Sequence, residues 1–185
     1  VTLDAGSQDE LDNMLEQMAE LVLDAGAMDV LVADTPAKIK DAWAARSSFL
    51  EAIMHETKLL DECDVVVPVN KIADYLDFVN KTGEDCGLVI KSFGHAGDGN
   101  LHIYQCSNDL EEEEFKSRVD KFFEIIYKEA TNCGGLVSGE HGIGSGKIKY
   151  LVDSVGETNM ALMEGIKRVF DPKMILNPGK VCYRL

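Results

Sequence analysis

Apolar residues recur every three or four positions in the first part of the chain, which is the period of an α-helix. Ser7 and Glu10 form a capping box at the start of this stretch, and Gly26 lies where such a helix should end. The apolar stripe between them is rich in methionine and leucine, so we expect it to pack into the core. The pattern predicts a first helix between these boundaries.

A second start signal follows at Thr35 and Pro36, an N-cap residue and a first-turn proline. This helix is predicted to continue past Trp43 to Ile53. Further helical patterns cover residues 69–79, 110–130, 147–152 and 159–170.

Short runs of β-branched and other apolar residues between the helices predict strands. They cover residues 30–32, 64–68, 87–95 and 101–106, and the last two are expected to pair as a hairpin. Strands that alternate with helices, together with one hairpin, predict an α+β fold. In this fold helices pack on a largely antiparallel sheet.

The predicted hairpin brings two histidines together. Asp98-Gly99 is a strong signal for a two-residue turn, and with this turn His95 and His102 lie directly opposite each other on one face of the sheet. Cross-strand neighbours have Cβ atoms about 5 Å apart. Two imidazoles at that separation can bind one metal ion.

A second glycine-rich segment, Ser138 to Gly144, places a carboxylate beside an imidazole. Glu140 and His141 would point to opposite sides of an extended chain, unless glycine-rich irregularity changes this. Either residue can complete a metal site while the other stays available for catalysis. Two histidines and one carboxylate suit Zn(II), Fe(II) or Mn(II). The two segments therefore favour a metal or catalytic site.

Length and charge narrow the classes of function. The 185 residues suit one domain, and 33 acidic against 18 basic residues give a net charge of −15. This charge argues against binding to nucleic acid or to anionic membranes. No apolar run approaches the roughly 20 residues of a membrane span. Five scattered cysteines without a CxxC pair are typical of reduced thiols in the cytoplasm.

Three segments resemble a known family: GHAGDGNLH (94–102), GEHGIG (139–144) and DPKMILNPGK (171–180). They are similar to the C-terminal cap domain of FAD-linked 2-hydroxyacid dehydrogenases. This group of vanillyl-alcohol-oxidase-type flavoproteins includes D-lactate dehydrogenases, the flavoprotein component of glycolate oxidase and D-2-hydroxyglutarate dehydrogenase. The resemblance implies that residues 1–185 form one ferredoxin-like cap domain. It also implies that FAD is bound mainly by an N-terminal half that precedes this chain. Residues 1–4, which look like the end of a strand, agree with that expectation.

The resemblance also implies roles for individual residues. His95 and His102 correspond to metal-binding histidines, and Glu140 corresponds to the carboxylate ligand of a Zn, Fe(II) or Mn ion. His141 corresponds to the catalytic histidine, which takes the proton of the substrate hydroxyl as hydride leaves for FAD. Arg46 corresponds to an arginine that binds the substrate carboxylate through its bidentate fork.

Three further positions bear on the cofactor and the substrate. Asn177 corresponds to an asparagine of the C-terminal tail near the flavin. Where the hydroxyglutarate enzymes carry a lysine and an asparagine toward the distal carboxylate, this chain has Glu62 and Tyr104. An acidic Glu62 would repel a second carboxylate, so D-lactate or glycolate is the expected substrate. Electrons would then pass to a quinone or to electron-transfer flavoprotein, and a homodimer is left open.

Two other functions stay open at this point. A stand-alone metal-dependent hydrolase or lyase would use His95, His102 and Glu140 to activate water, and it would be active without flavin. A non-catalytic interaction domain would keep the same polar loops for structural reasons. A retained metal with an open coordination position would argue against that last function.

Overall fold

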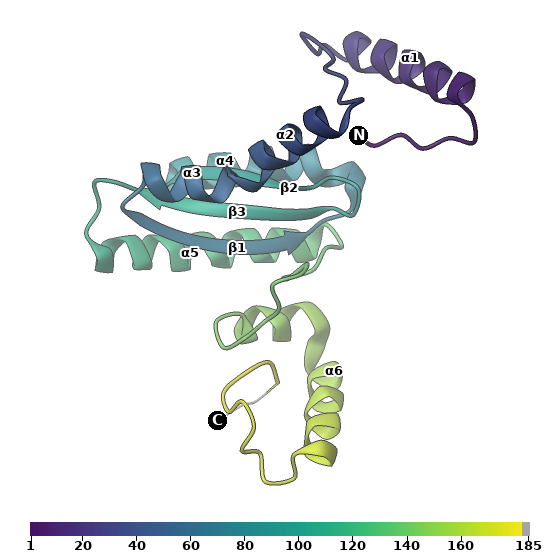
Figure 1. Cartoon of the computed structure of the whole chain (residues 1–185). Coiled ribbons are helices and arrows are strands. Elements are labelled where there is room, and N and C mark those ends of the chain that lie inside the picture. The colour runs from purple at the N-terminus through teal and green to yellow at the C-terminus, as the bar shows by residue number, and fades with distance from the viewer. Residues whose placement is uncertain (183–185) are drawn as a thin grey trace. The chain divides into compact units, whose positions relative to one another are not determined.

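The structure, a computed structural model, describes residues 1–182. Its contacts divide the chain into two compact units, residues 1–50 and the residues from 51 onward (Figure 1). None of the described helices is both long enough and apolar enough to cross a membrane.

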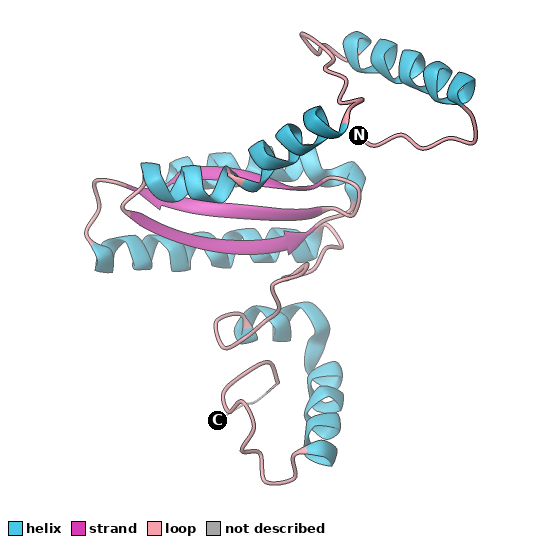
Figure 2. Cartoon of the chain, in the orientation of Figure 1, coloured by secondary structure: helices cyan, strands magenta, loops and turns pink. Residues whose placement is uncertain are grey.

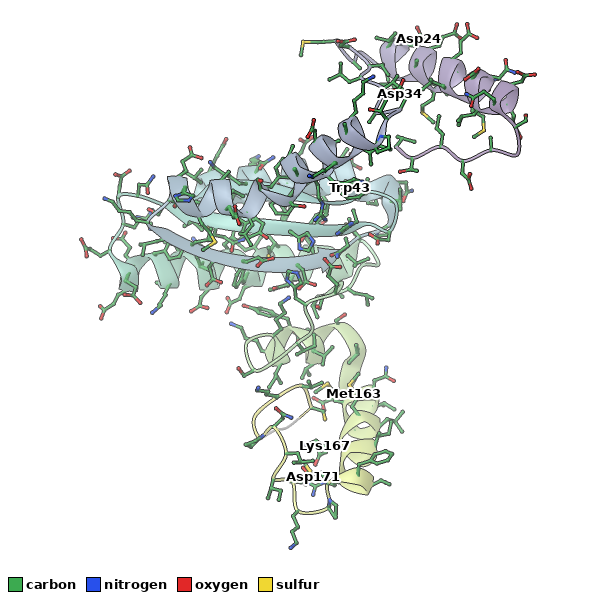
Figure 3. All side chains as sticks on the ribbon, viewed as in Figure 1. Asp24, Asp34, Trp43, Met163, Lys167 and Asp171 are labelled. Carbon is green, nitrogen blue, oxygen red and sulfur yellow. The ribbon has the colours of Figure 1, made fainter. Side chains whose placement is uncertain are left out.

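The first unit begins with the predicted helix. α1 (Gln8–Asp24) starts after Ser7, whose hydroxyl accepts the backbone N–H of Glu10 at 3.3 Å. No residue of α1 is buried, so the prediction that its apolar stripe forms core is wrong. The rest of this unit does not bury the stripe, and Trp43 in the next helix is itself 60% exposed (Figure 3).

Two other features of this part of the chain differ from prediction. Residues 30–32 form no strand, and neither do residues 1–4. The helix predicted to continue to Ile53 is divided into α2 (Pro36–Ser47) and α3 (Phe49–Glu56). At the junction the Ser48 hydroxyl donates to the carbonyl of Ala44 at 2.9 Å. Such side-chain bonds compete with the regular hydrogen bonding of a helix and promote a break.

The second unit is a three-stranded antiparallel sheet with helices packed on it (Figure 2). A 3-10 turn (Val69–Lys71) precedes its first helix, and the strand order is β1-β3-β2. The elements in chain order are β1 (Leu59–Val66), α4 (Ile72–Cys86), β2 (Val89–His95), β3 (Asn100–Ser107), α5 (Glu112–Asn132) and α6 (Ile148–Phe170). This arrangement confirms the predicted α+β fold.

The sequence of elements β1-α4-β2-β3-α5 is the first part of a ferredoxin-like fold. The place of a last strand beside β1 is taken by an isolated bridge between Val66 and Leu136. These two residues exchange backbone hydrogen bonds of 3.0 and 2.8 Å. The bridge holds the second glycine-rich segment, which follows it, next to the end of β1.

The two faces of the sheet have different surroundings. α4 and α5 cover one face, where Val65 of β1 and Phe122 of α5 belong to the main core (Figure 1). On the other face, Tyr104 of β3 packs with Ile53 of α3 in a smaller cluster. β3 is buried along its whole length because it is the central strand. A polar side chain on the second face of β3 is therefore buried as well.

The C-terminal part contains two helical segments, as predicted. They share the label α6 and meet at a kink where Gly156 has the non-helical angles φ 76° and ψ 164°. At the end of α6 Lys167 points toward Asp171, with 3.1 Å between Nζ and Oδ2 (Figure 3). Asp171 also accepts the backbone N–H groups of Ile175 and Leu176. This carboxylate fixes the turn at the start of the tail.

The β2–β3 hairpin has another register than the predicted one. His95 pairs with Asn100 and not with His102, so four residues connect the strands instead of two. The N–H groups of Asp98 and Gly99 both donate to the carbonyl of His95, at 3.3 and 3.1 Å. The register shifts by two residues, which keeps each side chain on its face. His95 and His102 therefore still lie on one face of the sheet.

Gly99 explains the wider turn. Its φ is 78°, in the region that favours glycine, and its carbonyl accepts the N–H of Val67 at 3.1 Å. A Cβ at this position would lie 1.9 Å from the carbonyl oxygen of Val67. The turn is thus fixed by the chain that follows β1, which a local turn signal does not contain.

We expect Gly99→Ala to lower the free energy of unfolding by about 3 kcal/mol, because it combines a strained φ with a backbone clash. Gly97→Ala is the matched control in the same turn, since a Cβ there meets nothing within 4 Å. The control should change stability by less than about 0.5 kcal/mol. The free energies of unfolding of both variants are measured by urea unfolding. Equal values for Gly99→Ala and Gly97→Ala would contradict the described turn.

Candidate functional site

Two histidines and one glutamate converge at one end of the sheet. His95 ends β2, His102 lies in β3, and Glu140 lies in the loop between α5 and α6. Glu140 Oε1 is 2.9 Å from His102 Nε2 and 3.6 Å from His95 Nε2. The potential ligand atoms of the three residues all lie within 4.8 Å of one another. The structure thus brings together three of the residues predicted to form a site.

A second group of side chains shares His102. The ring of His141 stacks on that of His102, with centroids 4.8 Å apart and an interplanar angle of 27°. On β1, Glu62 Oε1 lies 3.2 Å from His141 Nδ1 and 3.6 Å from His102 Nδ1. The Tyr104 hydroxyl donates to the same oxygen at 3.2 Å. The site is therefore assembled from three strands and one loop.

A buried carboxylate holds the loop that carries Glu140 and His141. Asp64 of β1 is fully buried, and its Oδ2 accepts the backbone N–H groups of Gly139, Glu140 and His141 at 2.7, 2.8 and 3.0 Å. The Ser138 hydroxyl donates to the same oxygen at 3.0 Å. Successive N–H groups directed at one anion form a nest. This curved backbone brings the side chains of Glu140 and His141 to the histidine cluster, whereas an extended backbone would point them to opposite sides.

Lys147 supplies the opposite charge for this carboxylate, with its ammonium in direct contact with Asp64 Oδ1. Burial by itself would raise the pKa of Asp64. The hydrogen bonds from Lys147 and from the backbone of His141 and Glu140 outweigh burial, and they hold the pKa of Asp64 well below its ordinary value. The carboxylate therefore stays ionised, and the nest keeps its anion.

The cluster has the chemistry of a cation site with an acid–base group beside it. Imidazole nitrogens with one carboxylate suit Zn(II), Fe(II) or Mn(II). His102 is 5% exposed, and its Nδ1 has no hydrogen-bond partner among residues 1–182, which is uncommon for a buried polar atom. The side chains of His95 and His141 are 40% and 43% exposed. A small molecule can therefore reach the open side of the cluster.

The two remaining predicted residues lie elsewhere along the chain. Arg46 is in α2 of the first unit, and Asn177 is in the tail after α6, where its φ is 45°. The tail returns to the glycine-rich loop through a hydrogen bond from Val181 N–H to the carbonyl of Gly144 at 2.7 Å. The contacts of Arg46 with a substrate and of Asn177 with a flavin stay predictions.

Sequence reasoning missed Asp64 and Lys147. The available signal was an acidic residue at the start of the apolar run DVVVP (64–68). A carboxylate in a strand of this kind needs a buried partner, but the partner lies 83 residues further along the chain. Glu62 was identified only as a residue that faces the substrate, and the structure adds its contacts with two histidines.

Comparisons with known proteins agree on one family. The family described as FAD linked oxidases, C-terminal domain, matches residues 1–181. The chain is 59% identical over 184 residues to a D-lactate dehydrogenase of Anaerostipes hadrus, and the alignment covers 100% of the chain and 39% of that protein. It is 33% identical over 178 residues to the glycolate oxidase subunit GlcD of Bacillus subtilis, and the alignment covers 95% of the chain and 37% of that protein.

A more distant relative is named for a dicarboxylate. The chain is 28% identical over 181 residues to a D-2-hydroxyglutarate dehydrogenase of Stutzerimonas stutzeri, with 96% of the chain and 39% of that protein covered. The chain therefore spans about two fifths of the length of these relatives.

The nest around Asp64 yields a test. We expect Asp64→Asn to lower the free energy of unfolding by about 3–5 kcal/mol, because it leaves the ammonium of Lys147, whose side chain is only 16% exposed, without its partner. Asp64→Asn combined with Lys147→Met should restore part of this loss. Glu124→Gln is the control, since Glu124 pairs with Lys149 on the surface, and it should cost less than about 1 kcal/mol. Urea unfolding is the measurement, and similar losses for Asp64→Asn and Glu124→Gln would contradict the buried pair.

Proposed function

Because the chain belongs to the family of FAD linked oxidases, C-terminal domain, we propose that it is the substrate- and metal-binding part of an FAD-dependent D-2-hydroxyacid dehydrogenase. In this proposal residues 1–185 are one cap domain of a longer polypeptide whose other part binds FAD. The whole protein oxidises a 2-hydroxy acid of the D-lactate or glycolate type to the 2-oxo acid. The observation that carries the proposal is the His95, His102 and Glu140 group, with His141 stacked beside it.

We propose that His95, His102 and Glu140 hold a divalent Zn, Fe(II) or Mn ion. Two observations support the fit: the three ligand atoms lie within 4.8 Å of one another, and the nest at Asp64 fixes the backbone of Glu140. A bound divalent ion acts as a Lewis acid that makes a nearby hydroxyl more acidic.

His141 acts as the general base in this proposal. Its Nε2 lies 3.9 Å from Glu140 Oε1, so it borders the proposed metal site. His141 takes the proton of the substrate hydroxyl. FAD, when bound by the rest of the polypeptide, would accept the hydride from the carbon that carries this hydroxyl. Arg46 binds the substrate carboxylate through two parallel hydrogen bonds, and Asn177 contacts the flavin.

The destination of the electrons is part of the proposal. Electron-transfer flavoprotein or a quinone would accept the electrons in the whole protein. The free thiols support a cytoplasmic setting, because Cys63, Cys86, Cys106 and Cys182 are buried and none of the five cysteines forms a disulfide. Burial raises the pKa of Cys63 to about 12, which makes that thiol a poor nucleophile.

The substrate class follows from Glu62. Its carboxylate lies beside the proposed base and is 30% exposed, so a negative charge faces the open side of the site. A second carboxylate on the substrate would be repelled there, whereas D-lactate and glycolate carry none. The named activity of the relative with 59% identity, a D-lactate dehydrogenase, supports the same choice.

Anaerobic D-lactate should bleach the flavin spectrum of the full-length protein, and about one metal ion per chain should be found by elemental analysis. His95→Ala should lose both the metal and the bleaching. His141→Ala should keep the metal while the rate of flavin reduction falls by roughly 10²–10⁴-fold, the usual contribution of a general base. A colourless protein that hydrolyses a substrate with metal alone would favour the hydrolase instead.

The substrate assignment has a separate test. We expect kcat/KM for D-lactate to exceed that for D-2-hydroxyglutarate by at least about tenfold, which corresponds to about 1.4 kcal/mol of unfavourable charge interaction. Steady-state kinetics with a dye acceptor measures both values. A preference for the dicarboxylate would contradict the role given to Glu62 in substrate choice, and it would leave the dehydrogenase proposal intact.

A further inference from the structure

One oxygen of Glu62 is approached by three potential hydrogen-bond donors. The Tyr104 hydroxyl donates to Oε1 at 3.2 Å, His141 Nδ1 lies 3.2 Å away, and His102 Nδ1 lies 3.6 Å away. Glu62 and Tyr104 are opposite each other in the β1–β3 ladder. The carboxylate therefore sits on a rigid strand and is held there by its cross-strand neighbour.

The two stacked imidazoles lie between two carboxylates. In both rings Nδ1 is the nitrogen near Glu62 Oε1, at 3.6 Å for His102 and 3.2 Å for His141, and Nε2 is the nitrogen near Glu140 Oε1, at 2.9 Å and 3.9 Å. A neutral imidazole carries one proton, on one nitrogen only. The position of that proton decides which nitrogen has the lone pair that can bind a cation or accept a proton.

We propose that Glu62, held by Tyr104, is a positioning residue that places the proton of both His102 and His141 on Nδ1. This inference rests on the proposed function, since it concerns the proposed metal ligand and the proposed base. It assigns an acceptor to His102 Nδ1, a buried atom without a hydrogen-bond partner in the described part of the chain. Histidines that bind metals usually donate their second N–H to a carboxylate or a carbonyl.

The consequence differs for the two rings. With its proton on Nδ1, His102 presents the Nε2 lone pair toward Glu140, where the proposed ion binds. His141 in the same tautomer presents its Nε2 lone pair to a substrate hydroxyl and can take its proton. The arrangement follows the logic of an Asp–His pair, in which the carboxylate orients the imidazole and stabilises its protonated form. One carboxylate thus serves both metal binding and proton transfer.

The test measures metal affinity and turnover in the full-length, FAD-loaded protein. Zn²⁺ affinity is obtained by competition with a chromophoric chelator, and kcat and KM are measured with D-lactate. Glu62→Ala should raise the Kd for Zn²⁺ by roughly 10–100-fold and lower kcat by a similar factor, because the imidazoles lose the carboxylate that orients them. Tyr104→Phe keeps the carboxylate but removes its support, so it should change both values in the same direction by a smaller factor.

Glu56→Gln is the matched control. Glu56 is an exposed carboxylate of α3 that pairs with Lys91 on β2 and contacts neither histidine in the described ion pairs. It should leave both Kd and kcat within about twofold of the wild type. A merely structural role of Glu62 would lower the melting temperature of the protein without changing the Zn²⁺ Kd relative to this control.

The outcomes separate this inference from the proposed function. If Glu62→Ala binds Zn²⁺ and turns over D-lactate like the wild type, the positioning role is overturned and the dehydrogenase proposal stands. If Glu62→Ala changes only the KM values of dicarboxylates, Glu62 acts on the substrate alone and the inference is again overturned. A wild-type protein that binds no Zn²⁺ and whose flavin D-lactate does not reduce would overturn the proposed function itself.

Discussion

The ionised, fully buried carboxylate of Asp64 is the interaction on which the candidate site depends. Three consecutive backbone N–H groups and one hydroxyl converge on a single oxygen of this side chain, while Lys147 contacts the other. A loop rich in glycine can adopt many backbone conformations. The position of the Glu140 and His141 side chains therefore depends on the Asp64 carboxylate near the end of β1. Without it the sheet would carry His95 and His102 alone.

The sheet supplies the second constraint, because alternation along a strand assigns each residue to a face. Glu62, His102 and Tyr104 share the face opposite α4 and α5, and this face is closed only in part by Ile53 of α3. The apolar face contributes most of the folding energy. The other face is free to combine charged and aromatic groups. This division of the two faces lets a small domain keep polar residues buried near its centre.

Much of this arrangement was predictable from the sequence. The antiparallel sheet, the helices on it and the grouping of His95, His102 and Glu140 follow from periodicity, from turn signals and from the family resemblance.

The exact pairing of the hairpin was not predictable, since the turn at Gly99 is set by contact with Val67. The prediction that His95 and His102 lie on one face of the sheet was confirmed, because side chains alternate between the faces and a register shift of two residues leaves each on the same face. Asp64 was missed because its partners lie far along the chain. The strand at 30–32 failed because three apolar residues without a pairing partner do not define a strand.

The long separation between Asp64 and its loop also has a kinetic consequence. The hydrogen bond from His141 N–H to Asp64 joins residues 77 positions apart. The hairpin that carries His95 and His102 closes over only a few residues and can form early. The nest requires a large loop to close, which costs more chain entropy and comes late in folding. The sequence separations therefore predict that His95 and His102 come together in partly folded chains, and that Glu140 and His141 join them only in the completed domain. Such an order would leave the group of histidines and carboxylates incomplete until the last long-range contact of the domain has formed.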